Sequence, residues 1–150
     1  MTRTLAKVLF GAILIGAVAT ALPQSVETDT RFATLDIYVE STEPLAAWQF
    51  ELREASGRMR VVGVENGEAA AFPEAPYYDL AAVSTGAADR IIVADYSLRP
   101  AGELPTGRNR VATIHIQVEG TVDPVYVLNL MAAGGADGEP IQAFIDVDTP

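Results

Sequence analysis

Apolar and polar residues alternate along most of the chain with the two-residue period of half-buried β-strands. The alternation is most regular over residues 112–118, where every second residue is alanine, isoleucine or valine. Ile114 and Ile116 are therefore expected to face a core, and Thr113 and His115 are expected to face solvent. The same period recurs in three further segments, residues 35–40, 48–53 and 141–147.

Turn-forming residues separate these segments. Asn66-Gly67 is a strong turn signal, and further glycine, proline and aspartate clusters follow at residues 100–107 and 134–138. Residues 68–88 show no clear period, so we expect a long loop there with at most one short element. Seven or eight short strands without a convincing helix predict an all-β antiparallel sandwich or barrel over residues 33–148.

The N-terminal segment has the composition of a secretory signal. Arg3 and Lys7 precede a small and apolar run from Val8 to Leu22, and small-x-small sites for signal peptidase occur at residues 17–19 and 19–21. The run of 15 residues is shorter than the roughly 20 that cross a bilayer as a helix. The sequence therefore predicts a signal peptide at residues 1–21 and a flexible lead-in at residues 22–32, with an uncleaved membrane anchor as the alternative.

Charge and cysteine content restrict the partners. The chain has 20 acidic and 10 basic residues, and two of the basic ones lie in the predicted signal, so the exported part carries a net charge near −12. Such a surface repels nucleic acid and anionic lipid. We therefore expect no nucleic-acid partner, and we expect a membrane contact only if the leader is retained. The chain has no cysteine, so we expect neither disulfides nor thiolate chemistry. The expected location is secreted, periplasmic or at the cell surface.

Several stretches of the chain resemble cohesin modules. The resemblance spans residues 33–147 and rests on the order of apolar strands and glycine-ended loops. The stretches that carry it are residues 45–52, 61–67, 89–97, 104–107 and 111–118. It implies a jelly-roll sandwich of eight or nine strands, a fold shared with carbohydrate-binding modules. Cohesins bind the dockerin modules of cellulosomal enzymes through one sheet face, so the resemblance implies an exported, non-catalytic, protein-binding module.

Residues 125–131 are apolar on both faces of the predicted strand. One face, with Tyr126, Leu128 and Leu130, is expected to meet the core. The other face carries Val127, Asn129 and Met131. That second face is either covered by the loop of residues 68–88 or exposed to a partner, and in the second case these three residues are the predicted protein-binding site.

Aromatic residues on the long loop support an alternative function. Phe72, Tyr77 and Tyr78 lie in this loop, and exposed aromatic rings in such positions bind sugars by stacking. A second interpretation is that Phe72 and one tyrosine close the end of the sandwich as core material. Trp48 alternates in step with Phe50 and is expected in the core. The alternative partner is therefore an extracellular polysaccharide.

No constellation of residues predicts catalysis or a transition-metal site. His115 is the single histidine and lacks a nucleophile motif, so it is expected on the sheet surface. A small glycan-acting hydrolase remains a remote alternative, because nothing selects a pair among the many carboxylates. No cofactor is expected. Asp137, Glu139 and Asp123 are oxygen ligands that suit structural calcium, although ordinary turn chemistry explains Asp137-Gly138.

If the leader is a signal peptide, the exported protein begins near Leu22. N-terminal sequencing of the exported protein checks this expectation. A membrane fraction in which the protein still begins at Met1 or Thr2 would show that the segment is an anchor.

Overall fold

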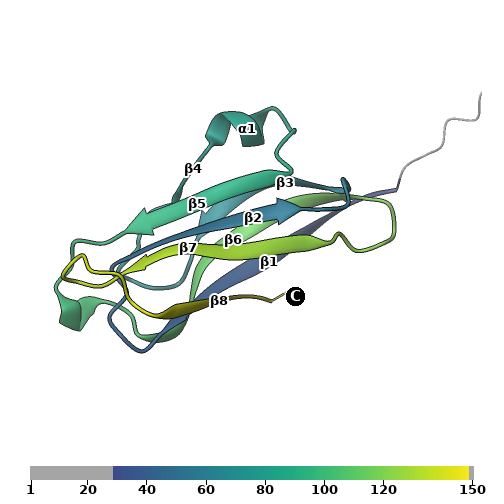
Figure 1. Ribbon diagram of the computed structural model, residues 1–150. Helices are drawn as coiled ribbons and strands as arrows, with labels where there is room; N and C mark the ends of the chain where they lie inside the picture. Colours follow the sequence, from purple (N-terminus) through teal and green to yellow (C-terminus); the bar gives the residue numbers. More distant parts are fainter. Residues whose placement is uncertain (1–28, 149–150) are drawn as a thin grey trace, which may run out of the picture.

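The computed structural model describes residues 29–148, which fold into a two-layered β-sandwich (Figure 1). The predicted signal, residues 1–21, lies outside the described residues. No helix among the residues described is long and apolar enough to cross a membrane. The strands are β1 (Thr30–Ser41), β2 (Ala47–Glu54), β3 (Met59–Asn66), β4 (Tyr77–Tyr78), β5 (Arg90–Tyr96), β6 (Gly107–Glu119), β7 (Tyr126–Gly134) and β8 (Ala143–Asp148). Two short helical segments, α1 (Leu80–Ser84) and a 3-10 turn at Ala101–Glu103, complete the fold.

The strands form two antiparallel sheets of four strands each. One sheet has the order β3-β6-β1-β8 and the other has the order β4-β5-β2-β7. The long β6 pairs with β1 on one side and with β3 on the other. In the second sheet, β2 lies between β5 and β7. The all-β sandwich that the sequence predicts is therefore confirmed.

The core lies between the two sheets and is built by the alternating residues of the inner strands. Trp48, Phe50 and Leu52 of β2 are at most 2% exposed, and Ile114 and Ile116 of β6 are equally buried. The Trp48 and Phe50 rings stack with their centroids 5.7 Å apart. Burying these large side chains contributes about 1.5–3 kcal/mol each, and this burial replaces the disulfides that the chain lacks.

The boundaries differ from the sequence prediction at two places. β1 begins at Thr30, inside the predicted lead-in, because β6 is long enough to pair with it as far as Glu119. The loop of residues 68–88 contains two short elements instead of at most one. β4 pairs with β5, and Asp79 caps α1 by accepting a hydrogen bond from the Ala82 amide at 3.0 Å.

Thr113 is only 7% exposed, although the alternation places it on the outer face, so the expectation that it faces solvent is wrong. Its hydroxyl donates to Asp36 Oδ1 at 2.5 Å and accepts from Arg110 Nη1 at 2.6 Å. These partners come from β1 and β6, and their side chains cover the hydroxyl. Buried polar groups in proteins are usually hydrogen-bonded, and the Thr113 hydroxyl follows this rule.

Gly67 allows the chain to cross closely over β6 after the Asn66-Gly67 turn signal. A Cβ atom at this position would lie 1.9 Å from the carbonyl oxygen of Arg110. The next amide, that of Glu68, donates to the same carbonyl at 3.0 Å. The sequence signal therefore marks a position where a side chain cannot be accommodated without moving the backbone.

The sandwich is less closed along the side where β7 and β8 lie. Both are edge strands, one in each sheet, and both lie on the same side of the molecule (Figure 1). Their inward residues, among them Leu128, Leu130 and Ile145, are half-buried, whereas the inward residues of β2 and β6 are fully buried. The two strands approach each other mainly near their connecting turn, where the Ile141 amide donates to the carbonyl of Ala133 at 3.0 Å.

Truncation of the inward residues of β6 should cost far more stability than truncation of His115. Ile114→Ala removes a fully buried side chain and should lower the free energy of unfolding by about 2–5 kcal/mol. His115→Ala should cost less than about 1 kcal/mol, because the side chain lies on the outer face. Urea denaturation followed by Trp48 fluorescence measures both, and equal losses would contradict the facing of β6.

Candidate functional site

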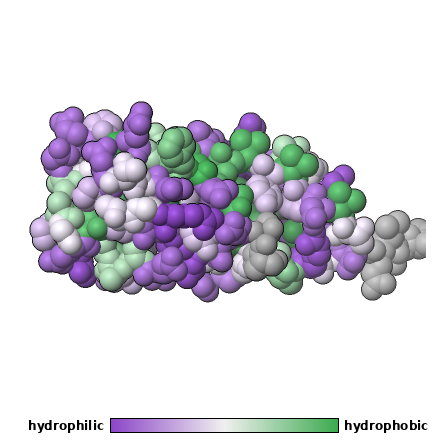
Figure 2. Space-filling model, turned by 90° about the horizontal axis from the view of Figure 1, so that it is seen from below, coloured by the Kyte–Doolittle hydropathy of each residue, from purple (hydrophilic) through white to green (hydrophobic). Residues whose placement is uncertain are grey.

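The outer face of the sheet β3-β6-β1-β8 carries a network of charged side chains. Arg108 lies 3.5 Å above the centre of the Tyr38 ring and pairs with Asp146 at 3.3 Å and Asp148 at 3.0 Å. The hydrogen bond to Asp148 is the largest of the effects that raise the pKa of the Arg108 guanidinium. Seen from the side of β8, the middle of the surface is strongly hydrophilic (Figure 2). Charged groups that already pair with one another are costly to cover with a partner.

The outer face of the other sheet, β4-β5-β2-β7, is much less charged. We call it the apolar face and define it by the outward residues of its four strands. These are Tyr77 of β4, Arg90, Ile92, Ala94 and Tyr96 of β5, Ala47, Gln49, Glu51 and Arg53 of β2, and Val127, Asn129, Met131 and Ala132 of β7. Its charged residues are Glu51, Arg53 and Arg90, and Glu51 forms an ion pair with Arg90. The two outer faces of the sandwich therefore differ in their content of charged side chains.

Val127, Asn129 and Met131 point outward, as the sequence predicts for a protein-binding strand. Val127 is 39% exposed and Met131 is 47% exposed. The interpretation in which the loop of residues 68–88 covers this face is therefore wrong, since the loop lies at the opposite edge of the sheet, around β4 and α1 (Figure 1). Gln49 of the neighbouring strand donates its amide to the Met131 sulfur at 3.4 Å. Their role in binding stays a prediction.

A tyrosine pair forms the far end of the apolar face. The rings of Tyr77 and Tyr96 are nearly parallel, at 8°, with centroids 6.1 Å apart, and both residues are more than half exposed. The Tyr96 phenol, through its charge and a hydrogen bond, raises the pKa of Tyr77. Sequence reasoning missed Tyr96, although it continues the β5 strand by the same two-residue period from Ile92.

The three residues predicted for sugar binding do not form one platform. Phe72 is 3% exposed and packs edge-on against Trp48 at 6.1 Å, so it closes the end of the core. Tyr78 is half-buried against the core. Tyr77 alone of the three is well exposed, and its aromatic neighbour is Tyr96 on β5 instead of a second loop residue. The interpretation of Phe72 as core material is therefore confirmed.

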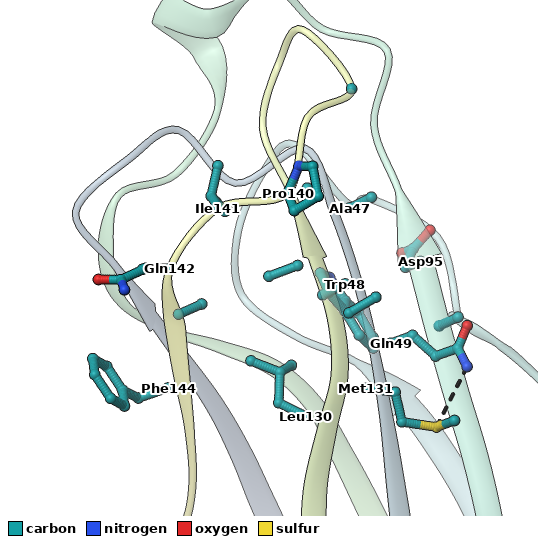
Figure 3. A pocket seen from close by; sticks show the side chains of 16 residues that line it. Ala47, Trp48, Gln49, Asp95, Leu130, Met131, Pro140, Ile141, Gln142 and Phe144 are labelled. Carbon is teal, nitrogen blue, oxygen red and sulfur yellow. Dashed lines mark hydrogen bonds between the residues drawn. The ribbon is translucent and has the colours of Figure 1, made fainter.

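A pocket of about 760 Å³ adjoins the apolar face at the C-terminal end of β7 (Figure 3). Small residues of β7, Ala132, Ala133 and Gly134, contribute to its lining. Met131 and Gln49 lie on one side, and Phe144 and Gln142 lie on the other (Figure 3). A pocket of this volume beside an apolar surface can receive a bulky side chain of a partner.

Burial affects a polar group of Asp95 and one of Trp48, both of which line this pocket. Burial raises the pKa of the Asp95 carboxyl, while the hydrogen bond that it accepts from the Tyr96 amide at 2.7 Å lowers it. The indole N–H of Trp48 has no hydrogen-bond partner among the described residues. The Trp48 N–H is therefore a buried donor without an acceptor in the described part of the chain, whereas the Asp95 carboxyl accepts one backbone hydrogen bond.

The residues considered for calcium do not come together. Asp123 precedes β7 and pairs with Arg31 at 2.5 Å. Asp137 lies in the turn that follows β7, where its side chain accepts from the Glu139 amide at 3.0 Å. The nine residues of β7 separate the two ends. Within residues 29–148 there is no group of three or more histidine, cysteine, aspartate or glutamate side chains placed to hold a metal ion.

His115 lies on the outer face of β6, as the sequence predicts. Its Nε2 atom is 3.0 Å from Glu65 Oε1 of β3, although the direction of the contact does not meet hydrogen-bond geometry. Gly63 leaves space beside the ring. The arrangement is a surface pair between neighbouring strands and holds no nucleophile.

Comparison with known proteins identifies a similar fold. No protein-family model and no curated protein sequence matches the chain. A solved structure, the crystal structure of a cohesin–dockerin complex of CaDoc0917 and CaCohA2, is similar with a TM-score of 0.56. The match covers 75% of this chain and 82% of that chain at 9% sequence identity. The chain therefore has a cohesin-like β-sandwich fold.

Proposed function

We propose that the chain is an exported, non-catalytic module that binds a partner protein through the apolar face. The observation that carries the proposal is the contrast between the two outer faces of the sandwich. Paired charges dominate the face of β3-β6-β1-β8, although Phe32, Val62 and Phe144 are exposed there, whereas the face of β4-β5-β2-β7 carries fewer charges and exposes valine, methionine and two tyrosines. A partner can cover the second face without separating an ion-pair network from water.

The composition of the apolar face fits a protein interface. Met131, Tyr77 and Tyr96 belong to the residue types that are enriched at interfaces, and all three are exposed. Asn129 and Gln49 supply hydrogen-bonding groups between the apolar side chains. The pocket beside β7 adds a recess at one end of the face, where a side chain of the partner would be enclosed.

The structural similarity supports a protein partner of this kind. The similar solved structure is that of a complex between two proteins, CaDoc0917 and CaCohA2. Since the identity is 9%, the similarity concerns the fold, and the choice of the face rests on the residues of this chain.

The second candidate function is binding of an extracellular polysaccharide. The specific observation that favours it is the exposed, nearly parallel pair of Tyr77 and Tyr96, because aromatic rings offer apolar faces to sugar rings. A polysaccharide site at this pair would use only one end of the apolar face, so Val127 and Met131 would not contribute.

Val127→Glu should strongly weaken partner binding and leave the fold intact. A carboxylate at this position would place a charge in the middle of the interface, where only Arg53 on the neighbouring strand lies opposite it, and we expect a loss of at least about tenfold in affinity, or 1.4 kcal/mol. The measurement is retention of extracellular proteins on the immobilised chain, followed by a titration of the retained protein, with circular dichroism as the check on folding.

Val62→Glu is the matched control, since Val62 is 38% exposed on β3 of the opposite sheet and Val127 is 39% exposed. The control should bind like the wild type. Equal loss in both variants, or no loss in either, would contradict the proposed face. Retention on insoluble polysaccharide that Tyr96→Ala removes and Val127→Glu leaves unchanged would establish the second candidate instead.

A further inference from the structure

β1 has an edge that its neighbours fill only in part. β6 pairs with all twelve residues of β1, from Thr30 to Ser41. On the other side, β8 pairs with β1 only from Asp36 to Ser41. Residues 31–35 of β1 have no strand beside them on that side within residues 29–148. Their outward backbone groups continue the line on which β8 pairs.

A groove of about 730 Å³ lies directly beside this edge. Ala33 and Leu35 form one wall, Ile116 and Val118 of β6 contribute to the lining from the core, and Tyr126 stands at the start of β7. The Arg31 guanidinium on β1 pairs with Asp123, in the loop before β7, at 2.5 Å. The ion pair therefore connects the two walls of the groove.

The edge has few of the features that usually prevent strand addition. Native sheets protect their edges with proline, bulges or charged side chains. Residues 31–35 contain no proline, and the register shift of β1 lies further along, between Ile37 and Tyr38. Arg31 is the single charged residue of the segment, and Asp123 already pairs with it. Phe32 on this edge is 71% exposed, and Val125 across the groove is 60% exposed.

We propose that the edge of β1 at residues 31–35 binds an extended peptide segment of a partner protein by strand addition. The peptide continues the line of β8, antiparallel to β1, so its residues opposite Ala33 and Leu35 face the groove. Those inward residues are apolar. The outward residues are neutral or basic, because the chain carries a net charge of −10 and Asp36 and Glu119 flank the segment on the same strand pair.

This site is independent of the proposed function. It belongs to the sheet β3-β6-β1-β8, whereas the apolar face belongs to the other sheet. Loss of binding at one site should therefore leave the other unchanged, and Val127→Glu should bind the peptide like the wild type.

The probe is a synthetic seven-residue peptide of alternating lysine and valine, titrated into the ¹⁵N-labelled domain. We expect amide shift changes centred on residues 31–35 and slower hydrogen exchange at every second amide of that segment, because only alternate amides point to the open edge. The same peptide with its central residue replaced by proline should bind at least fivefold more weakly, since proline cannot donate to the ladder.

Phe32→Ser should weaken binding of the peptide at least fivefold, because it removes the exposed ring beside the added strand. Phe144→Ser is the matched control: Phe144 is 74% exposed on β8 of the same sheet and should not affect binding. Several results would overturn the proposal: no shifts at residues 31–35 at millimolar peptide, equal binding of the proline peptide, or equal effects of the two serine variants. Concentration-dependent dimerisation that protects the same amides without peptide would assign the edge to a second copy of the chain.

Discussion

The close packing of the two inner sheet faces around Trp48 is the constraint on which the rest of the structure depends. Trp48 stacks on Phe50 within its own strand and meets Phe72 edge-on, which ties the long loop after β3 to the core. Without a cysteine in the chain, this apolar contact has to hold the sandwich together. The inward side chains of β1, β2 and β6 all pack in this core. The outward positions are therefore the ones available for recognition.

The side chains at these outward positions differ between the two sheets. On β3-β6-β1-β8, Arg108 and Arg110 connect strands through Asp146, Asp148 and Asp36, so the side chains bind one another. On β4-β5-β2-β7, few charged groups occur, and the exposed apolar side chains have no other part of the described chain above them. The second arrangement leaves apolar area in contact with water, and a partner protein that covers it gains the corresponding free energy of burial. The fold alone would permit either face, so the choice rests on the side chains.

The sequence alone predicted the strands that have one buried and one exposed face. It failed where contacts between residues distant in the sequence determine the burial of a side chain or the start of a strand. β2 and β6 alternate strictly because one face of each is fully buried. In β7 the apolar pattern was ambiguous, since an edge strand has a half-buried inner face and, here, an exposed apolar outer face. The burial of Thr113 depends on Asp36 from another strand, and the pairing of Tyr77 with Tyr96 depends on the contact between β4 and β5. Neither contact has a local sequence signal. The early start of β1 depends likewise on the length of β6.

Hydroxyl-radical footprinting of the domain with its bound partner tests the central claim most directly, because it reports side-chain exposure residue by residue. The account predicts that the partner protects Met131, Tyr77 and Tyr96, which are 47%, 64% and 55% exposed in the unbound chain. Oxidation of Tyr38 and Phe144, on the opposite sheet, should be unchanged. Protection of Tyr38 and Phe144 with full oxidation of Met131 would contradict the assignment of the apolar face as the binding surface.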